Sequence, residues 1–380
     1  MIRWILKYGV VIFLANTVLL SITQTMQLGY TIFLFLMSIV MLTLIINPIE
    51  VKKVLFHKAF GFLLLINFLN LIYFISFHNF SDIEAIKYLL ARGAQFSLIP
   101  FSIYYNFNYY NKNMFYHLAY IIFFIIILSV LLNPNIASGR YTGIIWNPNL
   151  FGAYCCLGFG MLLLDNKIKT RFIYFMLIVF FIMSLASGSR AVIVGLSLAF
   201  FIKFGFSLRN FLYATILSII FIFLVNLQLE TSFNRIYSQS ILEDRILQFK
   251  YALDTFYSKF WTGYGLDKYS YIEKSLVPEH LRGPIKGAHN GYLALLVQYG
   301  VVFGGFILSI IFYKSFYFIS SFFRFKNFHA TYVFIILFAL VAAIYESLLT
   351  GINMFHTVLF WFSLAFLSFS NYVKKKDYED

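Results

Sequence analysis

The sequence has little charge, almost no cysteine and no repeated unit, and each of these shortages excludes a class of protein. Charged residues make up 12% of its 380 positions, about half the share that is usual in soluble domains. The two cysteines, Cys155 and Cys156, are neighbours in an apolar run. Adjacent side chains of a helix point apart, so we expect packing residues and no disulfide. The lack of any fixed-period repeat excludes a solenoid.

Apolar residues, in contrast, fill most of the chain. Hydrophobic residues make up 61% and aromatic residues 21% of it, and the mean hydropathy is +0.81. Runs of about 17 to 25 apolar residues can cross the hydrocarbon core of a bilayer as helices. These runs lack period-two alternation, which excludes the strands of a membrane barrel. We count twelve runs: 5–23, 28–46, 59–78, 88–106, 115–132, 148–164, 172–186, 190–206, 210–227, 289–313, 330–350 and 354–372. The sequence therefore predicts an all-α integral membrane protein with about twelve transmembrane helices in one polytopic domain, residues 1–380.

The formal net charge of +14 invites a nucleic-acid hypothesis, which the distribution of the charge excludes. With the N-terminus in the cytoplasm, 17 of the 29 basic residues fall on the cytoplasmic side. The short loops of the other side hold very few, as the positive-inside rule requires. Arg3 and Lys7 ahead of the first run resemble the start of a signal peptide, but eleven further runs favour an uncleaved first helix. We expect both termini in the cytoplasm and no nucleic-acid partner.

Residues 228–288 form the one long polar segment, which this topology places outside the cytoplasm between the ninth and tenth spans. An apolar stripe with steps of four and three predicts an amphipathic helix in it: Leu242, Ile246, Phe249, Leu253, Phe256 and Phe260. Ser240 and Glu243 form a capping box at its start, and Gly263 and Gly265 supply the break at its end. We therefore expect a folded, helical extracytoplasmic loop subdomain over 228–288.

Ionisable residues inside the predicted membrane region mark candidate functional sites, because membrane helices carry them reluctantly. All of them fall in the outer third of the bundle: Arg92, Arg140, Arg190, His289, Glu346 and His356. A flippase or another transporter would have inverted repeats and charges near the midplane. We see neither, so a transporter is the less favoured alternative.

The residue types at these positions suit chemistry on an anionic ligand. An arginine fork makes two parallel hydrogen bonds to phosphate, although each arginine alone could also snorkel to headgroups. An unperturbed histidine titrates near neutral pH, so His289 suits a general base; the alternative is a wetted histidine at a helix start. For Glu346 we favour a structural ion pair with Arg92 or Arg190 over a catalytic acid.

Three stretches resemble the O-antigen ligase and Wzy-type polysaccharide polymerase family. They are GRYTGIIWNPNLFGAY (139–154), SGSRAVIVG (187–195), and DRILQFKYALDTFYSKFWTGYGLDKY (244–269) followed by AHNGYLALLVQYG (288–300). They occur in the family's order, whereas the first five spans match in hydropathy alone. The ligase-type signature is matched at His289, Asn290 and Gly300, but position 303 is Phe and the second glycine comes at Gly304.

The resemblance implies a GT-C-like bundle and roles for the matching residues. Arg140, Arg190 and Arg245 would bind the diphosphate of a polyprenyl-linked glycan, and His289 would act at the acceptor hydroxyl. Asn290, Arg92 and Glu346 are supporting candidates. The family's chemistry implies an inverting, metal-independent transfer without a cofactor.

On this basis we expect a glycosyltransferase of the bacterial cytoplasmic (inner) membrane that polymerises repeat units carried on undecaprenyl diphosphate. Its donor and acceptor would be lipid-linked glycans, and its partners the bilayer, a flippase and a chain-length regulator. A ligase that transfers finished glycan to lipid A core or another acceptor is the alternative within the family. A membrane acyltransferase with a single histidine is an alternative from another class, favoured if position 289 faces the cytoplasm.

Overall fold

The computed structural model describes residues 2–136, 140–165, 170–213, 215–216, 240–283, 285, 287–325, 329–347 and 349–379, with the backbone alone at residues 2, 240–244 and 375–379. Throughout these ranges the chain is helical between its turns, and the only strand-like pairing in them is one bridge between Ile22 and Ile145. Most of the predicted ninth span, 210–227, and the first part of the predicted loop lie outside the described residues, as do Lys286 and the side chains of the expected capping box.

Thirteen α-helices are described. They are α1 (Ile2–Leu20), α2 (Met26–Ile46), α3 (Pro48–Leu55), α4 (Gly61–Phe77), α5 (Ile83–Lys112), α6 (Met114–Leu132), α7 (Pro148–Leu164), α8 (Arg171–Ala186), α9 (Arg190–Phe204), α12 (Ser240–Ser258), α13 (Gly291–Phe325), α14 (Ala330–Ala342) and α15 (Phe355–Glu379). Every predicted apolar run except 210–227 overlaps one of them, which confirms the all-α class.

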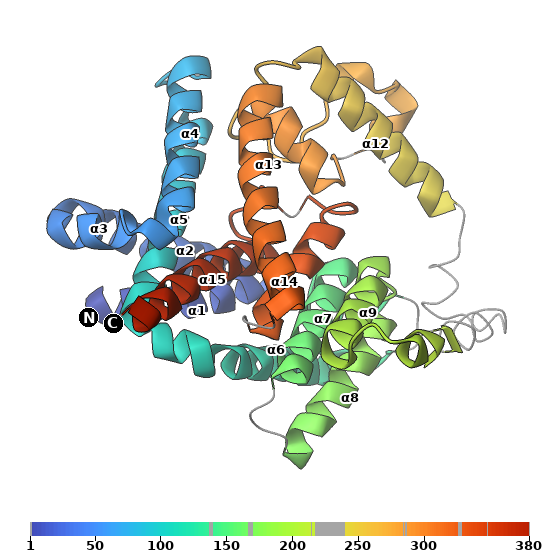
Figure 1. Ribbon diagram of the computed structural model, residues 1–380. Coiled ribbons are helices and arrows are strands. Elements are labelled where there is room, and N and C mark those ends of the chain that lie inside the picture. Colours follow the sequence, from blue (N-terminus) through green and yellow to red (C-terminus); the bar gives the residue numbers. More distant parts are fainter. Residues whose placement is uncertain are drawn as a thin grey trace.

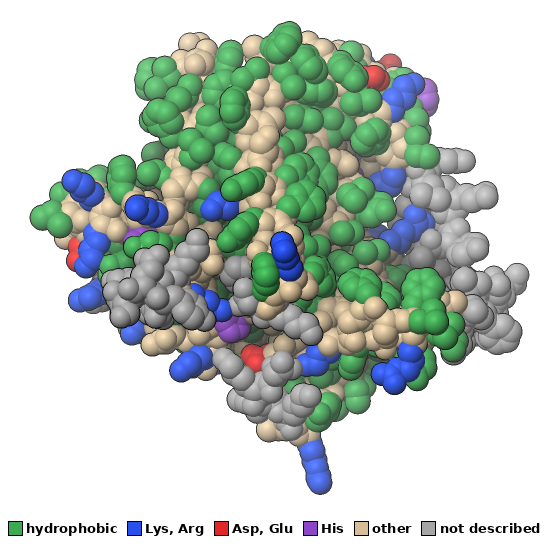
Figure 2. All heavy atoms as spheres, viewed as in Figure 1, with side chains coloured by type: hydrophobic (Ala, Val, Ile, Leu, Met, Phe, Trp, Pro, Cys, Tyr) green, Lys and Arg blue, Asp and Glu red, His purple; other side chains and the backbone are tan. Residues whose placement is uncertain are grey.

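Fewer than twelve of the described helices meet the length and hydropathy that a membrane span needs. In the described part, five helical segments are long and apolar enough to cross a bilayer, and α7, α8 and α14 are shorter apolar helices. The twelve predicted spans are therefore not confirmed as a number. Large apolar side chains cover much of the outer surface, among them Ile49 (83% exposed) and Leu34 and Phe124 (64% each), as the green side chains in Figure 2 show. An apolar surface of this extent identifies an integral membrane protein.

The helices form two groups that are joined by α14 and α15 (Figure 1). On one side α1 packs against α2 and α5, and α4 packs against α5 and α13; on the other, α7 packs against α6, α8 and α9. One continuous apolar core runs through both groups, and Phe13, Phe101, Phe151 and Phe334 are fully buried in it. The two chain ends lie close together in Figure 1.

The helix predicted from the loop stripe is confirmed as α12, which begins at Ser240 and packs against α13. A second, smaller core joins it to the first turns of α13, with Tyr251, Ala252 and Phe256 buried on the α12 side. Ile246 and Phe249 of the predicted stripe are 64% and 50% exposed. These two side chains therefore face outward, whereas Phe256 of the same stripe is buried in the second core.

A break inside α13 was not predicted. Gly300 has a φ of 69°, outside the helical region, in the middle of the apolar run. The carbonyls of Val297 and Gln298 accept hydrogen bonds from the backbone N–H groups of Tyr264 (2.9 Å) and Gly265 (3.0 Å). The turn after α12 therefore docks into the break. Gly263 (φ 69°) and Gly265 (φ 125°) confirm the predicted turn, since only glycine adopts such conformations at little cost.

Helix α4 fixes this docked turn from the other side. The Tyr73 hydroxyl donates to the carbonyl of Thr262 (2.6 Å), and the backbone N–H of Leu266 donates to Nε2 of His78 (3.0 Å). Nδ1 of His78 in turn lies 2.7 Å from a carboxylate oxygen of Asp82. The turn is thereby held at both ends, and it fixes the C-terminal end of α12, whose other end carries Arg245.

Candidate functional site

Glu346 is the centre of a polar network that joins three distant parts of the chain. Its Oε1 atom accepts a hydrogen bond from Nδ2 of Asn149 (2.8 Å) and lies 3.4 Å from Nη2 of Arg245. Its Oε2 atom lies 3.3 Å from Nδ1 of His289. These partners come from the first turn of α7, from α12 and from the turn before α13. Two of the family-matched residues, Arg245 and His289, therefore share one carboxylate.

Arg140 joins the network through Asn149. Its Nη2 atom donates to Oδ1 of Asn149, so the amide of Asn149 links the guanidinium on one side to Glu346 on the other. The start of α7 places this amide. Asn147 caps the helix by accepting from the backbone N–H of Asn149 (2.8 Å), and Pro148 occupies the first helical position, where its fixed φ is favourable.

Sequence reasoning missed the role of Asn149. The residue lies inside the quoted stretch WNPNL, in which an asparagine and a proline mark a helix start. That signal predicts where α7 begins, and it places a second asparagine in the half-buried first turn. The identity of its partner, Glu346, could not be read from the sequence because almost 200 residues separate the two.

Asn290 explains why the His-Asn pair stands at the start of a membrane helix. Its Oδ1 atom accepts from the backbone N–H of Leu293 (2.9 Å), which caps α13. Its Nδ2 atom donates to the carbonyl of Ile344 (3.1 Å). Asn290 thus begins the helix and at the same time holds the loop that carries Glu346. His289, the preceding residue, stands against that loop as a consequence.

The loop that carries Glu346 begins earlier than the sequence predicted. Helix α14 ends at Ala342, so the predicted eleventh span, 330–350, is too long at its end and Glu346 lies outside the helix. Ser347 fixes the loop next to the His-Asn turn. Its Oγ atom donates to the carbonyl of Ala288 (2.7 Å) and lies 2.7 Å from Oγ of Ser270.

The charges around Glu346 decide its protonation. Burial raises the pKa of this carboxyl, but the hydrogen bond from His289, the charge of Arg245 and the amide of Asn149 outweigh burial, so the pKa lies below its ordinary value of 4.5. Glu346 is therefore an anion at neutral pH. Its side chain is 25% exposed, and those of Arg245 and His289 are 31% and 36% exposed, so the network can be reached from outside.

Arg190 lies on a turn next to that of Arg140. It is the first residue of α9, and the backbone N–H of Tyr141 donates to the carbonyl of Ala186 (3.1 Å) in the turn between α8 and α9. Gly188 has a φ of 61° in this turn. The structure thus brings the loops of Arg140 and Arg190 together at the start of α7.

Arg92 is not part of the Glu346 network, and the expected ion pair between these two residues is wrong. Its guanidinium is buried in the bundle, 3% exposed, where it donates to Oε1 of Gln95 (2.7 Å), to the hydroxyl of Tyr88 (3.1 Å) and to the carbonyl of Thr350. Helix α5 therefore holds the far end of the loop that carries Glu346. Arg92 thus contacts this loop at the backbone carbonyl of Thr350 and not at the Glu346 side chain.

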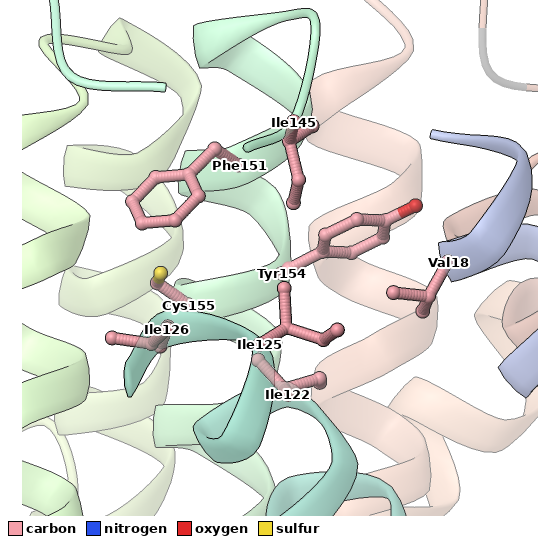
Figure 3. Close-up of a pocket in the computed structure, with 8 residues that line it drawn as sticks. All are labelled: Val18, Ile122, Ile125, Ile126, Ile145, Phe151, Tyr154 and Cys155. Carbon is pink, nitrogen blue, oxygen red and sulfur yellow. The ribbon is translucent and has the colours of Figure 1, made fainter. Parts of the chain in front are cut away.

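An apolar pocket lies under the start of α7 (Figure 3). Side chains of α1, α6 and α7 line it together with Ile145 of the Arg140 loop. Phe151, Tyr154 and Cys155 come from α7 itself, which confirms that this cysteine is a packing residue; Cys155 and Cys156 are both free and buried. None of the charged residues described above lines this pocket. The apolar side chains that pack around α7 are therefore distinct from the polar network at its first turn.

Comparison with known proteins gives one match. The family model described as O-antigen ligase matches residues 175–310, a little over a third of the chain, which includes Arg190, Arg245 and the His289–Asn290 pair. No curated protein matches the chain in sequence. Over residues 175–310 the resemblance to the O-antigen ligase and Wzy-type polymerase family, read from the sequence, is confirmed.

Proposed function

We propose that this integral membrane protein is a glycosyltransferase that joins glycans carried on undecaprenyl diphosphate at the outer face of the bacterial cytoplasmic membrane, as a repeat-unit polymerase. The observation that carries the proposal is the Glu346 network, in which Arg140, Arg245 and His289 converge from three separate segments. Residues from distant segments that share one carboxylate are typical of a site and not of independent headgroup anchors.

In the proposed reaction the acceptor hydroxyl of one lipid-linked glycan attacks C1 of the donor sugar of another. The new bond forms between the acceptor oxygen and C1, while the bond between C1 and the diphosphate oxygen breaks. The hydroxyl proton passes to His289, and undecaprenyl diphosphate leaves with the bonding electrons. An activated lipid donor is required because nucleotide sugars are absent outside the cytoplasmic membrane.

Glu346 suits the task of a positioning residue for His289. When Nδ1–H of the imidazole donates to the carboxylate, Nε2 carries the lone pair that accepts a proton. An anionic partner also stabilises the imidazolium that forms. The contact of 3.3 Å is long for a charge-assisted hydrogen bond, and such contacts shorten when substrate binds.

The arginines suit the leaving group. Negative charge develops on the diphosphate as the C1–O bond breaks, and preorganised guanidinium groups stabilise it. Arg140 and Arg190 would supply guanidinium groups for the diphosphate, beside Arg245 on Glu346. None of these roles calls for a metal ion or a cofactor. The bilayer, a flippase and a chain-length regulator remain the proposed partners.

A ligase is the second candidate, because the matching family model is described as O-antigen ligase. Deletion of the gene separates the two. Loss of a polymerase leaves single repeat units at the surface, whereas loss of a ligase leaves long chains on the lipid carrier. The lipid-linked glycan that accumulates would then be extracted and given to the purified protein.

The arginine role is tested with Arg140→Lys, which keeps the charge and loses the planar fork. We expect a loss of activity of about tenfold or more with the extracted lipid-linked glycan, because a charge-assisted hydrogen bond contributes roughly 1.5–3 kcal/mol. Arg324→Lys, at the far end of α13, is the control and should retain activity. Full activity of the Arg140→Lys variant would mean that this arginine only anchors its loop.

A further inference from the structure

His356 is a buried side chain that the proposed reaction does not use. It is the second residue of α15 and is 5% exposed. Neither of its ring nitrogens has a hydrogen-bond partner among the residues that the structure describes. An imidazole always presents at least one donor and, when neutral, one acceptor. Both capacities are unused here.

Buried polar atoms without partners are rare in folded proteins, and each one calls for an explanation. A phenylalanine or leucine would fill the same volume without that cost. A polar residue that stays at such a position is explained when a ligand supplies the missing hydrogen bonds, because an unpaired buried group is destabilising in the free protein alone.

The position of His356 relates it to the Glu346 network. Its neighbour Phe355 packs edge to face on Tyr154 of α7, with ring centroids 5.0 Å apart. The same helix carries Asn149, which binds Glu346, five residues earlier. The start of α15 therefore packs against the helix whose first turn binds Glu346.

Two further side chains between Glu346 and His356 have unpaired polar atoms. Oγ1 of Thr350, whose residue is 2% exposed, and Oδ1 of Asn353 are buried and have no partner in the described part of the chain. The Arg92 guanidinium contacts this segment at the Thr350 carbonyl, and its other hydrogen bonds go to Gln95 and Tyr88. The unpaired groups are thus a hydroxyl, an amide and an imidazole.

We propose that Thr350, Asn353 and His356 bind a sugar ring of the lipid-linked glycan beside the reacting groups held by Glu346. Hydroxyl, amide and imidazole groups match the hydroxyl groups of a sugar, whereas a diphosphate is matched by arginine forks. The inference rests on the proposed function and adds to it the part of the substrate that this segment recognises. The arginines take the diphosphate, and residues 350–356 take an adjoining sugar.

The test uses His356→Phe, which keeps the ring and most of the volume and removes both nitrogens. The probe is the lipid-linked glycan extracted from a strain that lacks this protein, and KM, kcat and the thermal midpoint are measured on the purified full-length chain. We expect KM to rise about 2- to 12-fold for each sugar hydrogen bond that is lost. The thermal midpoint should be equal to or above that of the wild type.

A second test variant and a control variant accompany His356→Phe. Thr350→Val removes one hydroxyl at nearly constant shape and should raise KM in the same way, even if His356→Phe inserts poorly. Ser363→Ala removes a buried hydroxyl of α15 that already donates to the Leu359 carbonyl (2.7 Å), and it should leave KM unchanged.

Wild-type KM and kcat in both His356→Phe and Thr350→Val would overturn the sugar site. The proposed transferase would stand in that case, provided that His289→Ala is inactive with the same glycan. Full activity of His289→Ala would instead contradict the proposed function itself, so the two failures are distinguishable.

Discussion

Nδ1 of His289 lies 3.3 Å from Oε2 of Glu346, although 57 positions separate the two residues in the sequence. Helix α14 brings them together by ending at Ala342, and Asn290 fixes the loop by donating to the carbonyl of Ile344. The pair gives the site a candidate base and the anion that orients it. Four predictions follow from the network around this pair and from the backbone that supports it.

Glu346→Gln keeps the size of the side chain and removes its charge. His289 then loses the anion that fixes its tautomer, so we expect glycan transfer to fall about 100-fold or more, within the range of general-base contributions. Initial rates of the purified variant check this. Glu273→Gln is the matched control, because this carboxylate binds Tyr271 and Ser275 away from the network; equal rates in the two variants would refute the positioning role.

The lowered pKa of Glu346 predicts a specific pH dependence of stability. The unfolded chain binds the proton at the ordinary pKa of 4.5, above that of the folded protein. The stabilisation is therefore complete above pH 4.5 and is lost as the pH falls through the folded-state pKa. Thermal midpoints of wild type and Glu346→Gln should converge as the pH is lowered below 4.5. If the two thermal midpoints instead differ by the same amount at every pH, the partners of Glu346 do not stabilise its carboxylate.

Asn149 links Arg140 to Glu346, and its replacement separates the two. Asn149→Leu removes both hydrogen bonds, and we expect turnover to fall about 10- to 100-fold, since each bond involves a charged group and contributes roughly 1.5–3 kcal/mol. Asn149→Asp adds a second carboxylate next to Glu346, which raises carboxyl pKa values by repulsion. As the pH is lowered, the activity of this variant should therefore begin to fall at a higher pH than the activity of the wild type. An unshifted profile would count against the link.

The break in α13 predicts opposite effects at two glycines of the same helix. Gly300 has a φ of 69°, and an added Cβ would overlap the carbonyl oxygen of Trp261. Gly300→Ala should therefore lower the free energy of unfolding by at least about 1–2 kcal/mol. At Gly305 a Cβ meets nothing within 4 Å, so Gly305→Ala should be neutral or stabilising by up to about 1 kcal/mol. Thermal unfolding in detergent measures both, and equal midpoints would show that the docked turn is not needed for stability.

Much of the fold could be predicted because membrane helices are marked by length and apolarity alone. The runs 115–132 and 148–164 coincide with α6 and α7 to within a residue at each end. The face that a helix buries could not be predicted in the same way. Ile246 and Phe249 of α12 are exposed although they belong to the apolar stripe, because periodicity shows which side chains share a face and not what covers that face.

The candidate site was predictable in its residue types and not in its pairings. Arg140 and His289 could be singled out because charged or titratable groups near a membrane are costly, and Arg245 was added by the family resemblance. Their common partner Glu346 was expected to pair with Arg92 or Arg190, since no local signal shows where α14 ends. The break at Gly300 was likewise hidden, because a glycine inside an apolar run fits a straight helix equally well.

The central claim is that His289, oriented by Glu346, takes the proton of the acceptor hydroxyl. The initial rate of glycan transfer from undecaprenyl diphosphate by purified His289→Ala, with its thermal midpoint as a check of folding, tests it most directly. We predict a rate about 10²- to 10⁴-fold below that of the wild type at an unchanged midpoint. A folded His289→Ala protein that transfers glycan at the wild-type rate would contradict the account.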